Sequence, residues 1–152
     1  MHIHITDEQL AANISSCLSL RGSCSDLASP NLVFHPTLEH CDGADHSALY
    51  RVHTYPWMSN PANVLHGGMT ATLLDTFMGV LCFGLYGVMT PTISITVNYA
   101  LPVPLDQDII VRARVTHTGG TSAHVTGEIW LPDDPDTLLA TATGVFYTAG
   151  RR

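Results

Sequence analysis

The feature that most constrains the fold is a long apolar run, residues 69–89, which contains a single carboxylate, Asp75. The run is apolar on nearly every helical face, and this pattern indicates a helix buried on all sides. About 20 apolar residues also suffice to span a bilayer. Asp75, three glycines within the run and the lack of Lys or Arg at either end argue against a span. We therefore predict a core helix packed closely against a sheet, with no membrane as partner.

A polar, turn-rich segment precedes the run and ends in His66, Gly67 and Gly68. Asn60 and Asn63 lie in this segment and disfavour an early helix start. The two glycines allow a backbone to approach a ligand where any Cβ would obstruct it. A helix beginning here would offer its first free N–H groups to a developing negative charge.

The segment before this turn predicts one helix and one hairpin. Thr6 and Gln9 have the spacing of a capping box, and apolar residues recur at helical spacing over residues 7–19. Residues 21–30 are rich in Ser, Gly and Pro and predict a connection. The expected hairpin has strands at 31–39 and 47–55 and a turn at Asp42-Gly43.

Four alternating segments follow the apolar run and predict antiparallel strands. Gly119-Gly120 and residues 132–136 provide turns between them. The inner faces carry small residues, which suit a sheet curled tightly around a helix. The predicted strands lie near residues 93–99, 109–116, 123–129 and 137–148.

Composition excludes several classes of partner. At 152 residues the chain is long enough for one domain with a substantial core. Its formal net charge of −7 argues against nucleic acid as partner. Only 12% of residues are charged, against about a quarter usually, which favours a surface partly covered by other subunits. The first residues lack the pattern of a signal peptide, and four cysteines without framework spacing fit reduced thiols, so we expect a cytoplasmic protein.

Histidines around the predicted hairpin raise the alternative of a zinc site. Their spacings match no compact ligand pattern, and strand alternation would scatter them over both faces. We therefore expect surface histidines and no metal. The residues concerned are His35, His40, Cys41, Asp42, His46 and His53.

The element order, together with Asn60, His66, Gly67, Gly68 and Asp75, resembles the hotdog-fold thioesterases, and among them the phenylacetate-degradation (PaaI-like) acyl-CoA thioesterases. The resemblance covers roughly residues 30–149. It implies an α+β hotdog fold, in which a curved antiparallel sheet wraps around a long central helix, here with an added N-terminal helix. The expected division is an N-terminal helical extension, residues 1–29, and a hotdog thioesterase domain, residues 30–152.

The sequence departs from the family at one position of the turn. The family usually carries a glycine three residues before the histidine, where this chain has Asn63. Asparagine tolerates a positive φ better than other non-glycine residues, so the turn is compatible with it.

The resemblance implies hydrolysis of an acyl-CoA without a cofactor. Gly67 N–H would polarise the thioester carbonyl, and Asp75 would act as general base toward water or as nucleophile. Asn60 and His66 would position the thioester and the nucleophile, and Thr92 would assist water or Asp75. Ser94 is an alternative for Thr92, because it lies two residues on with the same facing, and it is expected to contact the substrate.

Substrate contacts are expected from further residues. Gly68 adjoins the expected oxyanion site, and Arg112 and Arg114 share a strand face that could meet CoA phosphates, as could Arg151 and Arg152. The buried helix would line the acyl pocket through Phe77, Met78 and Leu81. Two rival functions remain: a hotdog hydratase or dehydratase, whose usual motif differs, and a non-catalytic acyl-binding module.

Helix geometry adds a constraint on the assembly. Asp75 lies eight residues after Gly67, which is about 12 Å along a helix. Two groups so far apart on one helix cannot reach the same carbonyl. If both serve one substrate, the site lies at a two-fold interface between chains. We therefore expect a homodimer, or a homotetramer built as a dimer of dimers.

Overall fold

The computed structural model describes residues 3–20 and 30–148. The predicted connection at residues 21–30 thus lies almost wholly outside the described residues, and the predicted domain boundary at residue 30 remains a prediction. The elements are α1 (Asp7–Leu18), α2 (Pro30–Val33), β1 (Thr37–Asp42), β2 (Ser47–Thr54), the 3-10 helix η1 (Pro56–Met58), α3 (Gly67–Tyr86), β3 (Thr92–Tyr99), β4 (Gln107–Thr118), β5 (Ser122–Trp130) and β6 (Ala140–Tyr147).

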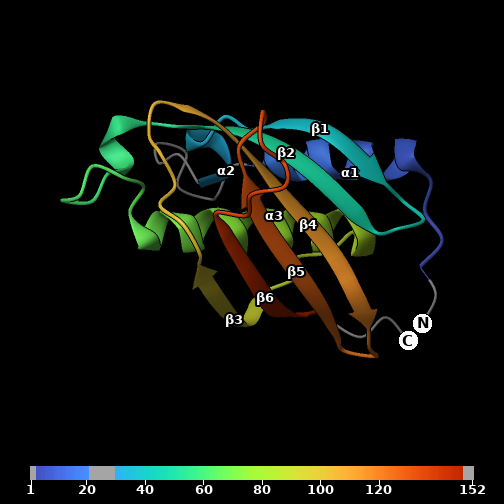
Figure 1. Ribbon diagram of the computed structural model, residues 1–152. Helices are drawn as coiled ribbons and strands as arrows, with labels where there is room; N and C mark the ends of the chain where they lie inside the picture. Colours follow the sequence, from blue (N-terminus) through green and yellow to red (C-terminus); the bar gives the residue numbers. More distant parts are fainter. Residues whose placement is uncertain (1–2, 21–29, 149–152) are drawn as a thin grey trace.

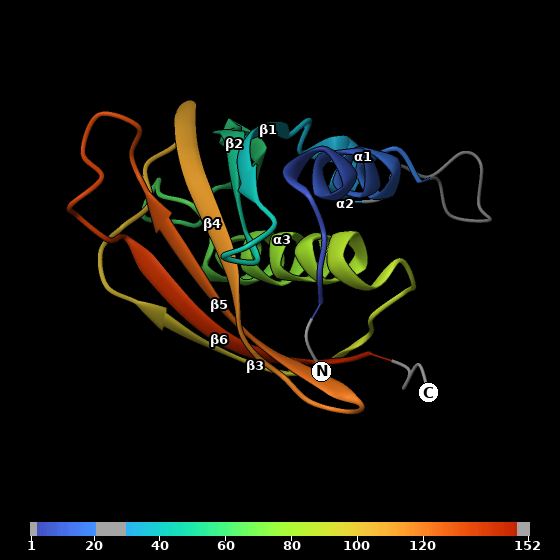
Figure 2. The same cartoon turned by 90° about the vertical axis from the view of Figure 1, so that its right-hand side faces the viewer.

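The six strands form one antiparallel sheet in the order β1-β2-β4-β5-β6-β3. Figures 1 and 2 show this sheet curving around α3, with α1 and α2 beside the helix on its other side. The predicted curved sheet around a central helix, with an added N-terminal helix, is confirmed. β3 has a single neighbour and is an edge strand.

Small residues on the inner face of the sheet allow α3 to pack closely. A Cβ added to Gly127 on β5 would lie 2.9 Å from Leu74 Cδ2 and 3.1 Å from Met78 Sδ of the helix. On β6, one added to Gly144 would lie 3.1 Å from Met78 Cε. Such contacts are tighter than ordinary packing, so a side chain at either position would require Leu74 or Met78 to shift, and glycine favours the observed separation of helix and sheet.

Helix α3 is the core of the molecule. Among the described residues it alone has the length and apolar character of a membrane span, yet more than half of that stretch is buried inside the protein. Gly87 follows it with a φ of +67°, a left-handed conformation that glycine adopts readily and that ends helices. The predicted core helix is thus confirmed.

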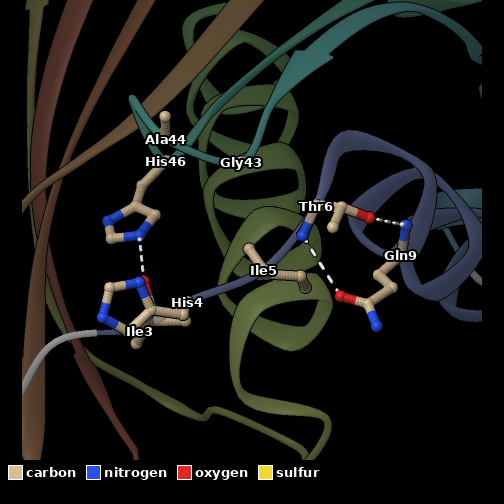
Figure 3. A pocket seen from close by; sticks show the side chains of 8 residues that line it. All are labelled: Ile3, His4, Ile5, Thr6, Gln9, Gly43, Ala44 and His46. Carbon is tan, nitrogen blue, oxygen red and sulfur yellow. Dashed lines mark hydrogen bonds between the residues drawn. The ribbon is translucent and has the colours of Figure 1, made fainter.

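Helix α1 is held against α3 and the β1–β2 turn. The predicted capping box is present, with Thr6 Oγ1 accepting from Gln9 N–H at 3.2 Å (Figure 3). Leu10 and Ile14 are fully buried and pack where Gly84 of α3 leaves room. The Asp7 carboxylate accepts from the backbone N–H of Gly43 at 2.7 Å, which joins the start of α1 to the hairpin turn.

The predicted hairpin is correct for its turn and second strand and wrong for the start of its first. Residues 31–36 are not extended: α2 begins at Pro30, a residue suited to the first turn of a helix, and His35 has a φ of +44°. Strand β1 begins only at Thr37. The turn is stabilised by the Asp42 carboxylate, which accepts from two backbone N–H groups at 2.7 and 2.8 Å.

We expect Leu10→Ala to lower the free energy of unfolding by about 2–5 kcal/mol, as truncation of a fully buried leucine does. The measurement is urea unfolding at a fixed protein concentration. Leu20→Ala is the control, because Leu20 is 43% exposed and its truncation should change stability by less than about 0.5 kcal/mol. Equal effects of the two changes would contradict the packing of α1 described above.

Candidate active site

The turn before α3 is organised by Asn60. Its Oδ1 accepts from the N–H groups of Ala62 at 2.9 Å and Val64 at 3.4 Å. Asn63 has a φ of +58°, so the residue that replaces the family's glycine does adopt a positive φ. The turn leads directly into the start of α3, and Asn60 lines a cavity there together with Gly67.

His66 caps α3 through the backbone N–H of Gly68 and leaves the backbone N–H of Gly67 available. Its Nδ1 accepts from Gly68 N–H at 2.9 Å, so the neutral ring carries its proton on Nε2. Within residues 3–20 and 30–148, no hydrogen bond of the Gly67 N–H is found. Of the two glycines predicted to meet the substrate, Gly67 therefore offers a free donor, while the Gly68 donor is occupied.

Tyr99, at the end of β3, was not predicted from the sequence as part of the site. Its hydroxyl donates to the backbone carbonyl of Gly67 at 3.0 Å, and its ring lies 3.4 Å from where a Gly67 Cβ would be. The tyrosine thus fixes the helix start from outside. A cavity of about 370 Å³ lies here, lined by Asn60, Gly67, Thr70, Tyr99, Leu101 and Val103 among others.

Asp75 and Thr92 meet at a second place. The Thr92 hydroxyl donates to Asp75 Oδ1 at 2.7 Å, a length typical of an O–H bond to a carboxylate. This contact brings together two residues that the sequence pointed to, from α3 and from the first position of β3. It orients the partly exposed carboxylate.

Ser94 does not share the facing of Thr92, contrary to expectation. Thr92 pairs with Phe146 of β6, whereas Ser94 pairs with the adjacent Val145. Adjacent residues of β6 face opposite sides of the sheet, so a β-bulge at Ile93 turns Ser94 away from Asp75. A one-residue bulge leaves no signal in an alternating pattern of this length.

A cavity of about 180 Å³ adjoins Asp75 and Thr92. The sequence predicted an acyl pocket lined by Phe77, Met78 and Leu81, but these side chains are fully buried. Phe77 stacks on Tyr50 of β2, and Met78 contacts the glycines of β5 and β6. The cavity lies along another face of the helix and is lined by Cys17, Asn31, Asp75, Thr76, Gly79, Val80, Phe83, Met89, Thr90, Thr92 and Phe146.

The site residues of one chain thus fall into two groups. Gly67 and Asn60 line the cavity at the start of α3, and Asp75 and Thr92 line the other. Along the helix the two groups are separated by about 12 Å, as expected from the sequence. One chain presents a hydrogen-bond donor and a carboxylate in separate places.

The two predicted CoA-binding arginines already have partners. Arg112 forms an ion pair with Glu128 and lies 5.7 Å from the centre of the Trp130 ring, and Arg114 forms an ion pair with Asp45. Binding a phosphate would require exchange of these partners. Arg151 and Arg152 lie outside the described residues.

The histidines of the hairpin region make local contacts. His53 Nδ1 lies 2.9 Å from Asp108 Oδ1, and this hydrogen bond raises the pKa of His53. His46 Nε2 lies 3.1 Å from the backbone carbonyl of Ile3 (Figure 3). Over the described part of the chain, no three His, Cys, Asp or Glu side chains are grouped as metal ligands.

Comparison with known proteins identifies similar chains. A family model described as the thioesterase superfamily matches residues 62–138, which is just over half of the chain. The human protein named acyl-coenzyme A thioesterase 13 is 35% identical over 97 residues, which cover 61% of each chain. The chain therefore aligns with about three fifths of the length of this curated relative.

Solved structures show the same fold. The PaaI protein of Escherichia coli, from the phenylacetic acid degradation operon, superposes with a TM-score of 0.78 at 17% identity, over 96% of this chain and 97% of that one. A hypothetical thioesterase from Streptococcus pneumoniae, solved with coenzyme A, gives a TM-score of 0.68 at 21% identity, over 78% of this chain and 91% of that one.

Proposed function

The chain belongs to the thioesterase superfamily, and from this premise we propose that it hydrolyses an acyl-CoA thioester to the free acid and CoA. The names of the curated relative and of the pneumococcal structure with coenzyme A support this substrate class. The observation that carries the proposal is that α3 bears both a free N–H group at its first residue and a carboxylate held by a threonine. These are the two groups that thioester hydrolysis needs.

Gly67 N–H stabilises the negative charge that develops on the thioester carbonyl oxygen. Attack on a thioester places negative charge on the carbonyl oxygen, and a preorganised N–H stabilises that charge. Such a donor is worth about 10²–10³ in rate. Gly67 N–H lies at the helix N-terminus, where the helix dipole adds to the effect, and Asn60 and His66 position the thioester beside it.

Asp75 either activates the water that attacks the thioester or attacks the thioester itself. As general base it takes a proton from water while the water oxygen bonds to the carbonyl carbon, and a positioned base contributes about 10²–10⁴ in rate. The C–S bond then breaks, and CoA leaves as a thiolate that needs little acid assistance. As nucleophile, Asp75 would instead form an acyl-enzyme that water cleaves. The Thr92 hydroxyl fixes the carboxylate for either route.

The two groups, Gly67 N–H and Asp75, come from two chains of a homodimer. Gly67 and Asp75 of one chain line different cavities, so one substrate reaches both groups only across an interface. The edge strand β3 supports this assembly, because its outer edge is unpaired and invites a second strand. Exposed apolar side chains gather on and beside it: Met89, Ile93, Tyr99 and Leu101 are 48–69% exposed. A second copy of the chain would cover them, and two such dimers could form a tetramer.

The role proposed for Asp75 is tested by substitution. We expect Asp75→Asn to lower kcat by at least about 10²-fold with an unchanged fold and dimer, because asparagine keeps the size but cannot accept the proton. CoA release from a panel of acyl-CoAs, followed with a thiol reagent, measures this and distinguishes hydrolysis from hydration or binding alone. The panel includes phenylacetyl-CoA and short, medium and long acyl chains.

Thr92 and Ser94 provide a matched pair for the same assay. We expect Thr92→Val to lower kcat while Thr92→Ser restores most of it, because only the hydroxyl contacts Asp75. Ser94→Ala should change kcat less than about twofold, since the bulge turns this side chain away. A larger loss in Ser94→Ala than in Thr92→Val would contradict the proposed role of Thr92.

A proline at position 67 would remove the Gly67 donor while it keeps a residue suited to the helix start. Gly67 is the first helical residue, where proline is well tolerated, and His66 has φ −61° and ψ +135°, an extended conformation that suits a residue before proline. We expect Gly67→Pro to have a kcat about 10²–10³-fold below that of Gly67→Ala. The alanine variant carries the added Cβ but keeps the N–H. Equal rates for the two variants would argue that another group binds the oxyanion.

Mixing of two altered chains tests the two-chain site. After subunit exchange, an equal mixture of Asp75→Asn and Gly67→Pro chains should recover about a quarter of wild-type activity. Half of the dimers are then mixed, and each mixed dimer has one intact site and one doubly altered site. Light scattering confirms the dimer, and exchange is checked with a mass-tagged chain. Complete exchange without recovered activity would assign Gly67 and Asp75 to the same chain's site.

A further inference from the structure

The cavity beside Asp75 extends along one face of α3. Asp75, Gly79 and Phe83 are spaced by four residues, so they follow one another along this face over about two turns. Apart from Asp75 and the threonines near it, the helix and β6 contribute mainly apolar atoms, including Val80 and Phe146. A thioester held at Asp75 would therefore have beside its reacting carbon a space lined about equally by polar and apolar atoms, with Val80, Phe83 and Phe146 in its apolar part.

Part of the wall comes from the N-terminal helices. Cys17 of α1 and Asn31 of α2 both line this cavity, although neither belongs to the motif around α3. Burial raises the pKa of the Cys17 thiol to about 11, so the thiol is neutral at physiological pH and presents an apolar surface. Asn31 is only half-buried.

Asn31 is shared between two spaces. Besides the cavity at Asp75, it lines an open groove of about 650 Å³ bounded by the end of α1 and the start of β1. The groove is lined by Ser15, Leu18, Ser19, Leu32, His35, Pro36, Thr37 and Leu38 as well. Asn31 thus borders both the smaller space that contains Asp75 and the larger groove.

We propose that the cavity beside Asp75 receives the acyl group, and that Asn31, together with Cys17, limits the length of the acyl group that fits. This inference rests on the proposed function and adds a specificity-determining role for residues that precede the sheet. The cavity of about 180 Å³ is close to the ~150 Å³ of an engineered cavity that holds one benzene molecule. We expect it to hold a single ring or an aliphatic chain of about six carbons, with Asn31 in the part of the wall that a longer chain would meet.

The test is the dependence of kcat/KM on chain length for straight-chain acyl-CoAs from acetyl to dodecanoyl. We expect the wild-type protein to favour hexanoyl- over decanoyl-CoA by at least about tenfold, since each misfitting methylene costs about 10-fold or more. Asn31→Ala joins the cavity to the groove and should raise the ratio of decanoyl to hexanoyl rates at least about tenfold. Asn31→Phe fills the cavity and should lower the ratio of hexanoyl to acetyl rates.

Asn13→Ala is the control for general loosening of the N-terminal helices. Asn13 Nδ2 donates to the backbone carbonyl of Gly84 at 2.8 Å, which holds α1 to α3, but Asn13 lines neither space. We expect this variant to be less stable with an unchanged chain-length profile. A profile shifted equally by Asn13→Ala and Asn31→Ala would overturn the inference, as would wild-type preference for dodecanoyl-CoA or Asn31 variants with the wild-type profile.

The same data separate this inference from the function on which it rests. If no acyl-CoA in the series is hydrolysed in an Asp75-dependent way, the proposed function fails. If hydrolysis depends on Asp75 but the Asn31 variants keep the wild-type profile, the function stands and the acyl group lies elsewhere.

Discussion

The close contact between α3 and the inner face of the sheet is the constraint on which the rest of the structure depends. Gly127 and Gly144 remove the side chains that would hold Leu74 and Met78 away. The sheet can therefore curl around the helix with apolar atoms in contact, and dispersion and the hydrophobic effect stabilise the arrangement. The same packing fixes which helical face meets the sheet. Because that face is occupied by the sheet, Asp75, Gly79 and Phe83 lie on a different face, which lines a cavity.

Helix α3 sets the separation between Gly67 and Asp75, the two groups of the proposed site. Its first residue presents an N–H group that has no partner within the described part of the chain, and its third turn presents a carboxylate. Neither group can approach the other within one chain. Each group is held by an element from outside the helix: Tyr99 fixes the Gly67 carbonyl, and Thr92 fixes Asp75. Both residues belong to β3, the edge strand with exposed apolar side chains. One strand thus contacts both halves of the proposed site and borders the surface that a second chain would cover in the proposed dimer.

The sequence predicted those parts of the fold and site that follow from local patterns. The capping box at Thr6, the buried helix, the four strands after it and the positive φ at Asn63 depend on residue type and periodicity over a few positions. The start of β1 was missed because Pro30 begins a helical turn in an otherwise strand-like segment. The sequence predicted Phe77, Met78 and Leu81 as lining of an acyl pocket, but these side chains are fully buried. The sequence of a helix that is apolar on every face does not indicate which face meets the sheet. The contact of Tyr99 with Gly67 was missed for a related reason, as was the role proposed for Asn31, because both depend on contacts between distant segments.

The bulge at Ile93 has a consequence for how relatives of this chain are compared. It adds one residue to β3 and so determines which position carries the hydroxyl that faces Asp75. A related chain without the extra residue would keep the hydroxyl in the same place in space but one column away in an ungapped alignment. Identity counted column by column along this strand would then understate the likeness of the two sites. Superposition of the strands, with the bulge as the point of reference, gives the correct correspondence.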